Sequence, residues 1–384
     1  MSAGAGASPA ERRARVALSR LGEPGDPRLA DLVAELGAEE VHRFLLAQTD
    51  ATGVATDVAA RLRGLDPEGD LRRADRSGLR FLCPGDEEWP QRITDLDRSQ
   101  PVNRRGGAPL GLWVRGVGRL DRLAERSVSI VGSRSATTYG AGVAADLAAG
   151  LAGEGVTVVS GAAFGIDQAA HRGALAARGP TVAVLACGVD RAYPTAHRDL
   201  LAYVAETGLI VSELPPGCAP TKLRFLARNR LIAALSLGTV VVEAAVRSGA
   251  LNTASWASSC GRLLMGVPGP VTSASSEGVH EMIRNRDAAL VTRASDVLEL
   301  VSPSGSYTQE VRRAPETPWD RLPVEERQVL DAVPVARPAP AESVARTAGL
   351  SMRTTQAALE RLRAAGLVEA WPSGWRLPSR AAAP

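Results

Sequence analysis

The sequence predicts an α/β protein: an extended Rossmann-like domain with a doubly wound, mostly parallel sheet, between a small helical domain and a C-terminal winged helix. From about Leu79, short β-rich runs alternate with Ala-rich helical stretches, which is the pattern of a parallel sheet with crossover helices. Apolar residues at helical spacing precede that region, and a stretch rich in Pro, Ser, Thr and charge follows it. The 384 residues suffice for two or three folding units.

Residues 1–75 are predicted to form a disordered head followed by a small helical domain of the SAM-like kind. Apolar spacing predicts helices at Glu11–Leu21 and Pro27–Gln48. Asp26 and Pro27 form the expected cap and first turn of the second helix. We assign the apolar positions of both helices to the core of this domain.

Residues 76–301 are predicted to form the Rossmann-like domain. Short apolar and β-branched runs there predict six strands, with helices between them. The predicted strands are Ser127–Val131, Thr157–Ser160, Thr181–Leu185, Leu209–Ser212, Thr239–Glu243 and Leu263–Val267. Six such units make a doubly wound sheet.

Residues 302–318 are predicted to be a linker, and residues 319–384 a winged-helix domain. The predicted elements are helices Val324–Val333, Ala341–Ala348 and Met352–Ala365 and strands Leu367–Trp371 and Trp375–Leu377. Arg346, Arg353, Arg361 and Arg363 are candidates to face duplex DNA. Winged helices also serve as protein interfaces, and the sequence leaves both roles open.

The composition excludes some classes of protein and leaves others open. No apolar run approaches the roughly 20 residues of a bilayer-spanning helix, and the N-terminal residues lack the apolar segment of a secretory signal, so we expect a cytoplasmic protein. The four cysteines lack metal-ligand spacing, and we expect neither a metal site nor a disulfide. The net charge of +3 is compatible with an anionic partner without establishing one.

Three predicted strands end in turns of small residues. Gly132, Ser133 and Arg134 follow the first strand, a geometry in which backbone N–H groups and a helix N-terminus face an anion. The turn lacks both GxGxxG and GxxxxGK[ST], so we expect no dinucleotide or NTP cofactor. Gly161 and Gly165 belong to the second turn, and Arg247–Ala254 form a third. We expect the first two turns to line one pocket near the switch in strand order, and the third turn points at the same edge of the sheet. The predicted nucleic-acid-binding residues of these turns are Gly132, Ser133, Arg134, Gly161 and Gly165.

The segment Thr221–Arg230 is the most specific in the chain, and its Lys222 is the only lysine. On a helix, Phe225, Arg228 and Asn229 share one face. A base stacked on an aromatic ring, with cations at the backbone, is how proteins hold single-stranded nucleic acid. A solvated basic helix face with a core Phe225 explains the same pattern, so the segment alone leaves both interpretations open. The predicted DNA-binding residues here are Lys222, Phe225, Arg228, Asn229 and Arg230.

No residue is predicted to be catalytic. His171 has no partner at a spacing that would make it a general base, and Ser160 lies outside a GxSxG motif. Glu243, at a strand end, is assigned to holding the donors of neighbouring loops.

Taken in order, these segments resemble the DNA-processing protein A family (DprA, also called Smf), over nearly the whole chain. The matching segments are Ile130–Arg134, Val159–His171, Val184–Tyr193, Ile210–Glu213, Phe225–Ala233, Glu243–Thr253 and Val267–Gly269, with Trp89-Pro90 upstream. Two features depart from the family pattern: Leu226 replaces the usual Pro, and Val279-His280 stands where Gly is commonly followed by Asn.

The resemblance implies a non-catalytic protein that binds single-stranded DNA, forms a homodimer through the Rossmann-like domain and loads RecA recombinase in natural transformation and recombination. It implies DNA contacts at Arg134, Lys222 and Phe225. Two alternatives stay open. One is a nucleotide-processing hydrolase of the lysine-decarboxylase-like group, for which Gly238-Thr239 lacks the glycine pair and Glu243 is one residue too far. The other is a winged-helix transcriptional regulator with a ligand-sensing α/β domain.

Overall fold

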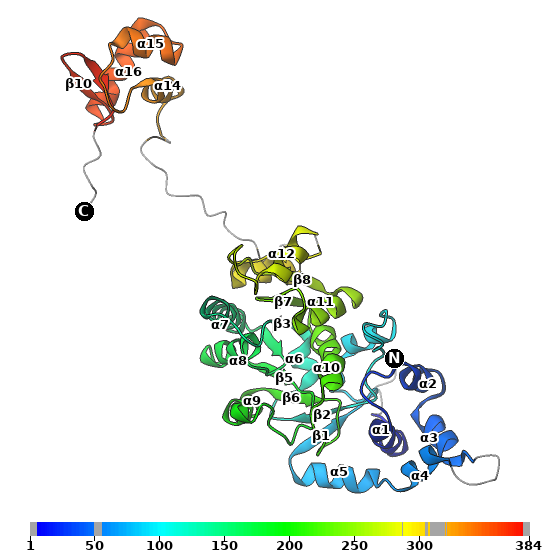
Figure 1. Ribbon diagram of the computed structural model, residues 1–384. Helices are drawn as coiled ribbons and strands as arrows, with labels where there is room; N and C mark the ends of the chain where they lie inside the picture. Colours follow the sequence, from blue (N-terminus) through cyan, green and yellow to red (C-terminus); the bar gives the residue numbers. More distant parts are fainter. Residues whose placement is uncertain are drawn as a thin grey trace. The chain divides into compact units, whose positions relative to one another are not determined.

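The computed structural model describes residues 6–49, 56–285, 287–303, 306–307, 319 and 321–378 (Figure 1). The chain forms two compact units, Met1–Gln309 and Glu310–Pro384. Residues 1–5 of the predicted head and most of the predicted linker lie outside the described residues. Across the described ranges, every helix is too short or too polar to cross a bilayer.

The N-terminal helices belong to the same compact unit as the sheet. They are α1 (Pro9–Leu21), α2 (Pro27–Leu36), α3 (Ala38–Ala47), α4 (Asp57–Arg63) and α5 (Pro67–Arg76). These helices have a small core of their own, formed by Ala14, Leu18, Val33, Ala38 and Val41. Val16 and Ala74 also share a buried cluster with Phe81 and Trp113 of the first two strands, so α1 and α5 pack against the sheet as well.

The predicted helix Pro27–Gln48 is wrong as one element, because it is two helices. Gly37 interrupts it with a φ of 81°, in the left-handed region that ends helices. Asp26 caps α2 as predicted, since its side chain accepts a hydrogen bond from the backbone N–H of Arg28.

The sheet has nine strands in the order β1-β2-β6-β5-β4-β3-β7-β8-β9. The strands are β1 (Leu79–Leu82), β2 (Leu112–Arg115), β3 (Ser127–Val131), β4 (Thr157–Ser160), β5 (Thr181–Val184), β6 (Leu209–Ser212), β7 (Gly238–Val241), β8 (Leu263–Gly266) and β9 (Ala289–Leu290). The six predicted strands all exist. Sequence reasoning missed the two strands β1 and β2, which pair antiparallel at one edge, and the two-residue β9 at the other.

Helices cover both faces of the sheet, as the predicted doubly wound fold requires. These helices are α6 (Leu120–Glu125), α7 (Thr138–Gly153), α8 (Ile166–Ala176), α9 (Arg198–Thr207), α10 (Lys222–Leu235), α11 (Gly249–Ser259), α12 (Glu277–Arg284) and α13 (Ala294–Val301). Ile130 of β3 packs in a cluster with α7, α8 and α13, whereas its neighbour Val131 packs with α10 and α11. Alternate residues of a strand point to opposite faces, so both faces of β3 are buried.

The strand order reverses direction at β3. Going along the chain, β4, β5 and β6 are added on one side of β3, whereas β7 and β8 are added on the other. The loops that leave β3 and its neighbours diverge at this point, and crevices for ligands form there in open α/β sheets.

The C-terminal unit contains the elements of the predicted winged helix in the predicted order. They are α14 (Val324–Ala332), α15 (Ala341–Ala348), α16 (Met352–Ala364), β10 (Glu369–Trp371) and β11 (Gly374–Arg376), the two strands pairing antiparallel. Arg361 forms an ion pair with Glu326, and Arg363 forms one with Glu360. Two of the four candidate arginines of this unit are therefore already partnered within the protein.

Candidate nucleic-acid interface

A pocket of about 660 Å³ lies where the strand order reverses. The turns after β3, β4 and β7 and one side of α10 line it. The lining residues are Val131, Gly132, Ser133, Arg134, Ser135, Ala163, Asp167, Lys222, Phe225, Leu226, Arg228, Asn229, Ile232, Arg247, Ser248, Gly249, Ala250 and Thr253. The three small-residue turns thus share one pocket, which was predicted for the first two of them.

Glu243 holds the turn after β3 in place. Its backbone oxygen accepts a 2.7 Å hydrogen bond from the N–H of Ser133. Its carboxylate, which is 2% exposed, accepts hydrogen bonds from the backbone N–H and hydroxyl of Thr137 and from the hydroxyl of Ser275. Arg134 is left exposed and forms no ion pair or hydrogen bond with any described residue.

Arg228 lies at the bottom of the pocket and ties two strand ends together. Its Nη1 donates to the carbonyl oxygens of Gly161, at 2.6 Å, and Val184, at 2.7 Å. A Cβ on residue 161 would lie 2.0 Å from that nitrogen, so any other residue there would displace the Arg228 guanidinium. Burial lowers the pKa of Arg228 to about 10, although nearby Asp167 opposes the shift. The guanidinium therefore stays charged at neutral pH and contributes positive potential to the pocket.

Asp167 shapes the turn after β4. It is fully buried, which raises the pKa of its carboxyl, while Arg228 and the N–H groups of Ala163 and Gly161 oppose that shift. Gly165 precedes α8 with a φ of 78°, and a Cβ there would lie 2.3 Å from the backbone oxygen of Ser133. Gly161 and Gly165, both predicted to bind DNA, are outside the pocket lining and serve close backbone packing.

The first turn of α10 places cations at the positive end of the helix. Thr221 caps the helix by accepting a hydrogen bond from the N–H of Arg224, and Lys222 is its first residue. A cation at a helix N-terminus costs about 0.3–1 kcal/mol, whereas an anion is stabilised there. Lys222 is exposed and forms no ion pair within the described part of the chain. This turn is thus suited to an anionic ligand.

Phe225 lies half-buried in the pocket wall, among cations and a second ring. The Arg134 guanidinium is 4.7 Å from the ring centroid, and that of Arg228 is 5.8 Å away. The ring of Tyr193 is 5.6 Å from that of Phe225, tilted by 46°. The site therefore combines an aromatic surface with exposed and buried positive charge.

Asn229 and Arg230 differ in position although they are adjacent. Asn229 lines the pocket and donates to Asn252 Oδ1 at 3.1 Å. Arg230 is 0% exposed and forms two 2.7 Å hydrogen bonds with the Glu213 carboxylate. It is five residues from Phe225, about 140° around the helix, so it points away from the pocket. The predicted DNA contact at Arg230 does not fit this geometry.

Two residues with functional side chains, one in the pocket wall and one beside it, were absent from the predicted DNA-binding residues. Arg247 is exposed, lines the pocket from the turn after β7 and forms no ion pair with another described residue. In the sequence, the position of Arg247 in a small-residue turn after a strand was the feature that could have identified it as a pocket residue. Tyr193 comes from the loop before α9, and nothing in its local sequence indicates that its ring meets Phe225.

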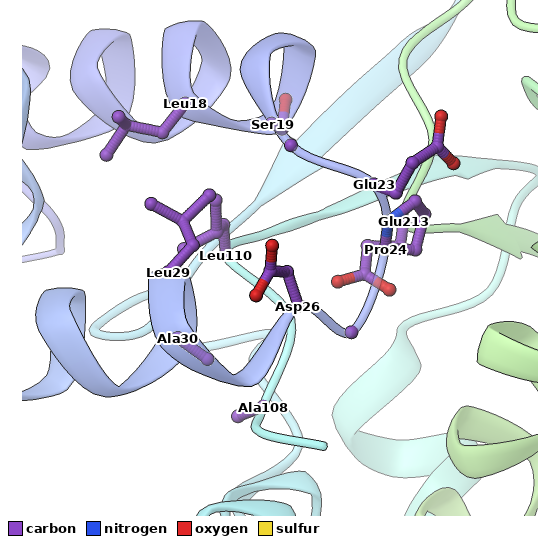
Figure 2. Close-up of a pocket in the computed structure, with 12 residues that line it drawn as sticks. Leu18, Ser19, Glu23, Pro24, Asp26, Leu29, Ala30, Ala108, Leu110 and Glu213 are labelled. Atoms are coloured by element: carbon purple, nitrogen blue, oxygen red, sulfur yellow. The ribbon is translucent and has the colours of Figure 1, made fainter. Parts of the chain in front are cut away.

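The turn between α1 and α2 packs against the same helix. Glu23 forms an ion pair with Arg224 at 2.7 Å. Figure 2 shows this turn, whose Glu23, Pro24 and Asp26 line a small cavity together with Glu213. That cavity has a volume of about 20 Å³ and holds no more than a water molecule. The larger pocket is therefore the candidate ligand site.

Comparison with known proteins identifies the family. The model of the family described as DNA recombination-mediator protein A matches residues 80–302. The chain belongs to this family. A Mycobacterium tuberculosis protein bearing the DprA name is 43% identical over 95% of this chain and 94% of its own length. Protein Smf of Escherichia coli is 34% identical over 77% of this chain and 76% of its own length.

Two solved structures are similar to this family member. DNA processing protein A of Streptococcus pneumoniae superposes with a TM-score of 0.62 at 29% identity, over 77% of this chain and 98% of that one. The protein of the same name from Helicobacter pylori gives a TM-score of 0.50 at 28% identity, over 58% and 95%. The latter structure concerns the single-stranded DNA binding mode of the Helicobacter protein. The family and fold predicted from sequence are therefore confirmed.

Proposed function

We propose that the pocket binds single-stranded DNA, with a base on Phe225 and phosphates at Arg134, Lys222 and Arg247. The observation that carries this proposal is the exposed Arg134 guanidinium, which lies 4.7 Å from the Phe225 ring without an ionic partner among the described residues. Aromatic stacking contributes about 1–3 kcal/mol per base and tolerates any sequence. The binding mode of the Helicobacter relative supports the same class of ligand.

In this proposal, DNA binding replaces the contact between Arg134 and Phe225 with contacts to a phosphate and a base. In the free protein the Arg134 guanidinium covers the Phe225 ring. An incoming phosphate gives Arg134 a stronger, charge-assisted partner, and the ring face becomes available for a base. The buried charge of Arg228 and the N-terminus of α10 add positive potential without moving.

We infer that the pocket carries out no catalysis. The candidate acid–base groups are already engaged: Glu243 by Thr137 and Ser275, and Asp167 by two backbone N–H groups. Their work is to shape turns, which favours DNA binding over the hydrolase alternative. The residues proposed for DNA contact are Gly132, Ser133, Arg134, Lys222, Phe225, Asn229 and Arg247, and Arg228 contributes its charge from beneath them.

We further propose that the bound strand is transferred to RecA recombinase in the cytoplasm, by a homodimer formed through the Rossmann-like domain. The description of the matched family as a recombination mediator supports this role. A mediator must hold single-stranded DNA and then release it, and a site that binds largely through charge allows both.

The test is a salt series with a fluorescent oligothymidine, comparing the wild type with Arg134→Ala and Lys222→Ala. We expect each substitution to weaken binding about tenfold and to lower the salt slope by about 0.7, the counterion release of one cation on a single strand. Arg172→Ala is the matched control, because Arg172 is exposed on α8 and lines neither this pocket nor a neighbouring one. Unchanged affinity in both pocket variants would overturn the proposed site.

A further inference from the structure

A second basic pocket lies on the other side of Tyr193. It has a volume of about 580 Å³ and is formed by the end of β2, the loop before α9 and one side of α9. Its lining residues are Arg115, Asp190, Arg191, Ala192, Tyr193, Thr195, Arg198, Leu201, Ala202, Ile210 and Pro220. No residue of this pocket was among the predicted DNA-binding residues, although Asp190–Tyr193 fall in a segment that matches the family.

The charges of this pocket are available to a ligand. Arg191 and Arg198 are exposed and Arg115 is partly buried, and none of them has an ion pair or side-chain hydrogen bond with a described residue. The acidic residue in the lining, Asp190, accepts the N–H of Gly217 at 2.9 and 3.0 Å instead of pairing with these arginines. The pocket therefore has a positive potential.

The apolar surface that this pocket offers beside these charges is an aromatic ring. Leu201 and Ile210 line the pocket but are only 2% and 1% exposed, whereas Tyr193 is 44% exposed. An inorganic anion needs only the cations, whereas a nucleotide presents both a flat apolar base and a phosphate. The combination is suited to a nucleotide, as in other grooves that hold single strands.

The two pockets meet at a pair of aromatic rings. Phe225 lines the first pocket and Tyr193 the second, with their ring centroids 5.6 Å apart. Tyr193 is 44% exposed, so its ring is open to stacking. A strand with one base at these rings has phosphates on both sides, and unpartnered arginines lie on both sides.

We propose that this second pocket is a further nucleotide-binding subsite, which extends the single-stranded DNA track from Phe225 past Tyr193 to Arg115, Arg191 and Arg198. The proposal rests on the proposed function of the first pocket. It identifies the ligand as the continuation of the same strand, so its contribution depends on the length of the DNA.

The experiment measures the affinity of the full chain for oligothymidines of about 4 and about 12 nucleotides, lengths at the two ends of typical single-strand site sizes. The double variant Arg191→Ala, Arg198→Ala is expected to bind the shorter strand within about twofold of wild type and the longer about tenfold more weakly. Its salt slope for the longer strand falls by about 1.4, for two lost cations. Arg172→Ala controls for loss of an exposed charge, and Tyr193→Phe is expected to retain the longer-strand affinity that Tyr193→Ala loses.

Each contrary outcome has its own meaning. If the double variant binds both strands like wild type while Arg134→Ala weakens both, the second subsite is overturned and the proposed function stands. If Arg134→Ala weakens neither strand, the proposed function itself fails. Thymidine monophosphate that binds wild type but not the double variant, with longer-strand affinity unchanged, would show a free-nucleotide pocket and also overturn the extended track.

Discussion

The first three turns of α10 carry similar cations in different surroundings. Lys222, in the first turn, is exposed and without an ionic partner among the described residues. Arg228 and Arg230, about two turns later, are buried. Arg228 donates hydrogen bonds to two carbonyl oxygens, and Arg230 forms an ion pair with Glu213. One helix thus uses positive charge for two purposes: exposed cations are available to an anionic ligand, whereas buried ones hold the strand ends that form the pocket.

The largest effect that tests this comparison is expected from Arg230→Ala. Removing it leaves the Glu213 carboxylate, whose side chain is 10% exposed, without its partner. We expect a loss of about 3–5 kcal/mol in the free energy of unfolding, measured by urea denaturation. Lys222→Ala is the control and should leave stability within about 0.5 kcal/mol. A stable Arg230→Ala protein with weakened DNA binding would break the comparison.

A buried histidine sharpens the comparison through the pH dependence of stability. His171 is 0% exposed; its Nδ1–H donates to Thr181, and its Nε2 has no hydrogen-bond partner among the described residues. Burial, and to a lesser extent His197 and Arg228, lowers the pKa of His171 from 6.5 to about 3. The unfolded chain therefore binds this proton more readily, so stability is full above pH 6.5 and falls as the pH drops toward 3.

Below pH 6.5, His171 is expected to lower the free energy of unfolding by about 1.4 kcal/mol per pH unit, which gives about 2 kcal/mol at about pH 5. Urea unfolding of wild type and His171→Gln at about pH 5 and pH 7 measures it as a difference between the two proteins. An identical pH dependence in both would show that His171 is protonated within the folded protein.

A smaller effect is expected from Phe225→Ala. The ring is half-buried and is proposed to stack on a base, so we expect binding of a short oligothymidine to weaken about tenfold, a little over 1 kcal/mol. Phe225→Tyr keeps the ring and should retain most of the affinity. Equal loss in both variants would point to packing of α10 instead of stacking.

The smallest effect is expected where the N-terminal helices meet α10. Glu23 pairs with Arg224, and the Arg224 hydrogen bond keeps the pKa of Glu23 low, so the carboxylate is charged at neutral pH. Glu23→Gln removes a negative charge near the first turn of α10 and should strengthen DNA binding about twofold at low salt. The gain should vanish at high salt, and a gain that persists there would exclude this electrostatic origin.

Local sequence determined much of the fold and the approximate location of the site. The strands from β3 to β8 were predictable because each is a short run buried on both faces, bounded by turn residues. Strands β1 and β2 were not, because β2 pairs antiparallel with β6, which comes from far along the chain, and β1 pairs antiparallel with β2. The meeting of the turns after β3 and β4 was predictable, since parallel strands bring their carboxyl ends to one edge of a sheet. Arg134, Lys222 and Phe225 were grouped by the family resemblance.

Only the tertiary structure decided which side chains of that region face the pocket. Arg228 and Arg230 look alike in the sequence, and their different positions depend on Gly161, Val184 and Glu213, which come from other loops. The contact between the rings of Tyr193 and Phe225 likewise joins two segments that lie 32 residues apart in the sequence. The residues that pack against a cation decide whether it is free or partnered. Local sequence shows the periodicity of a helix, but it does not show which distant residues pack against that helix.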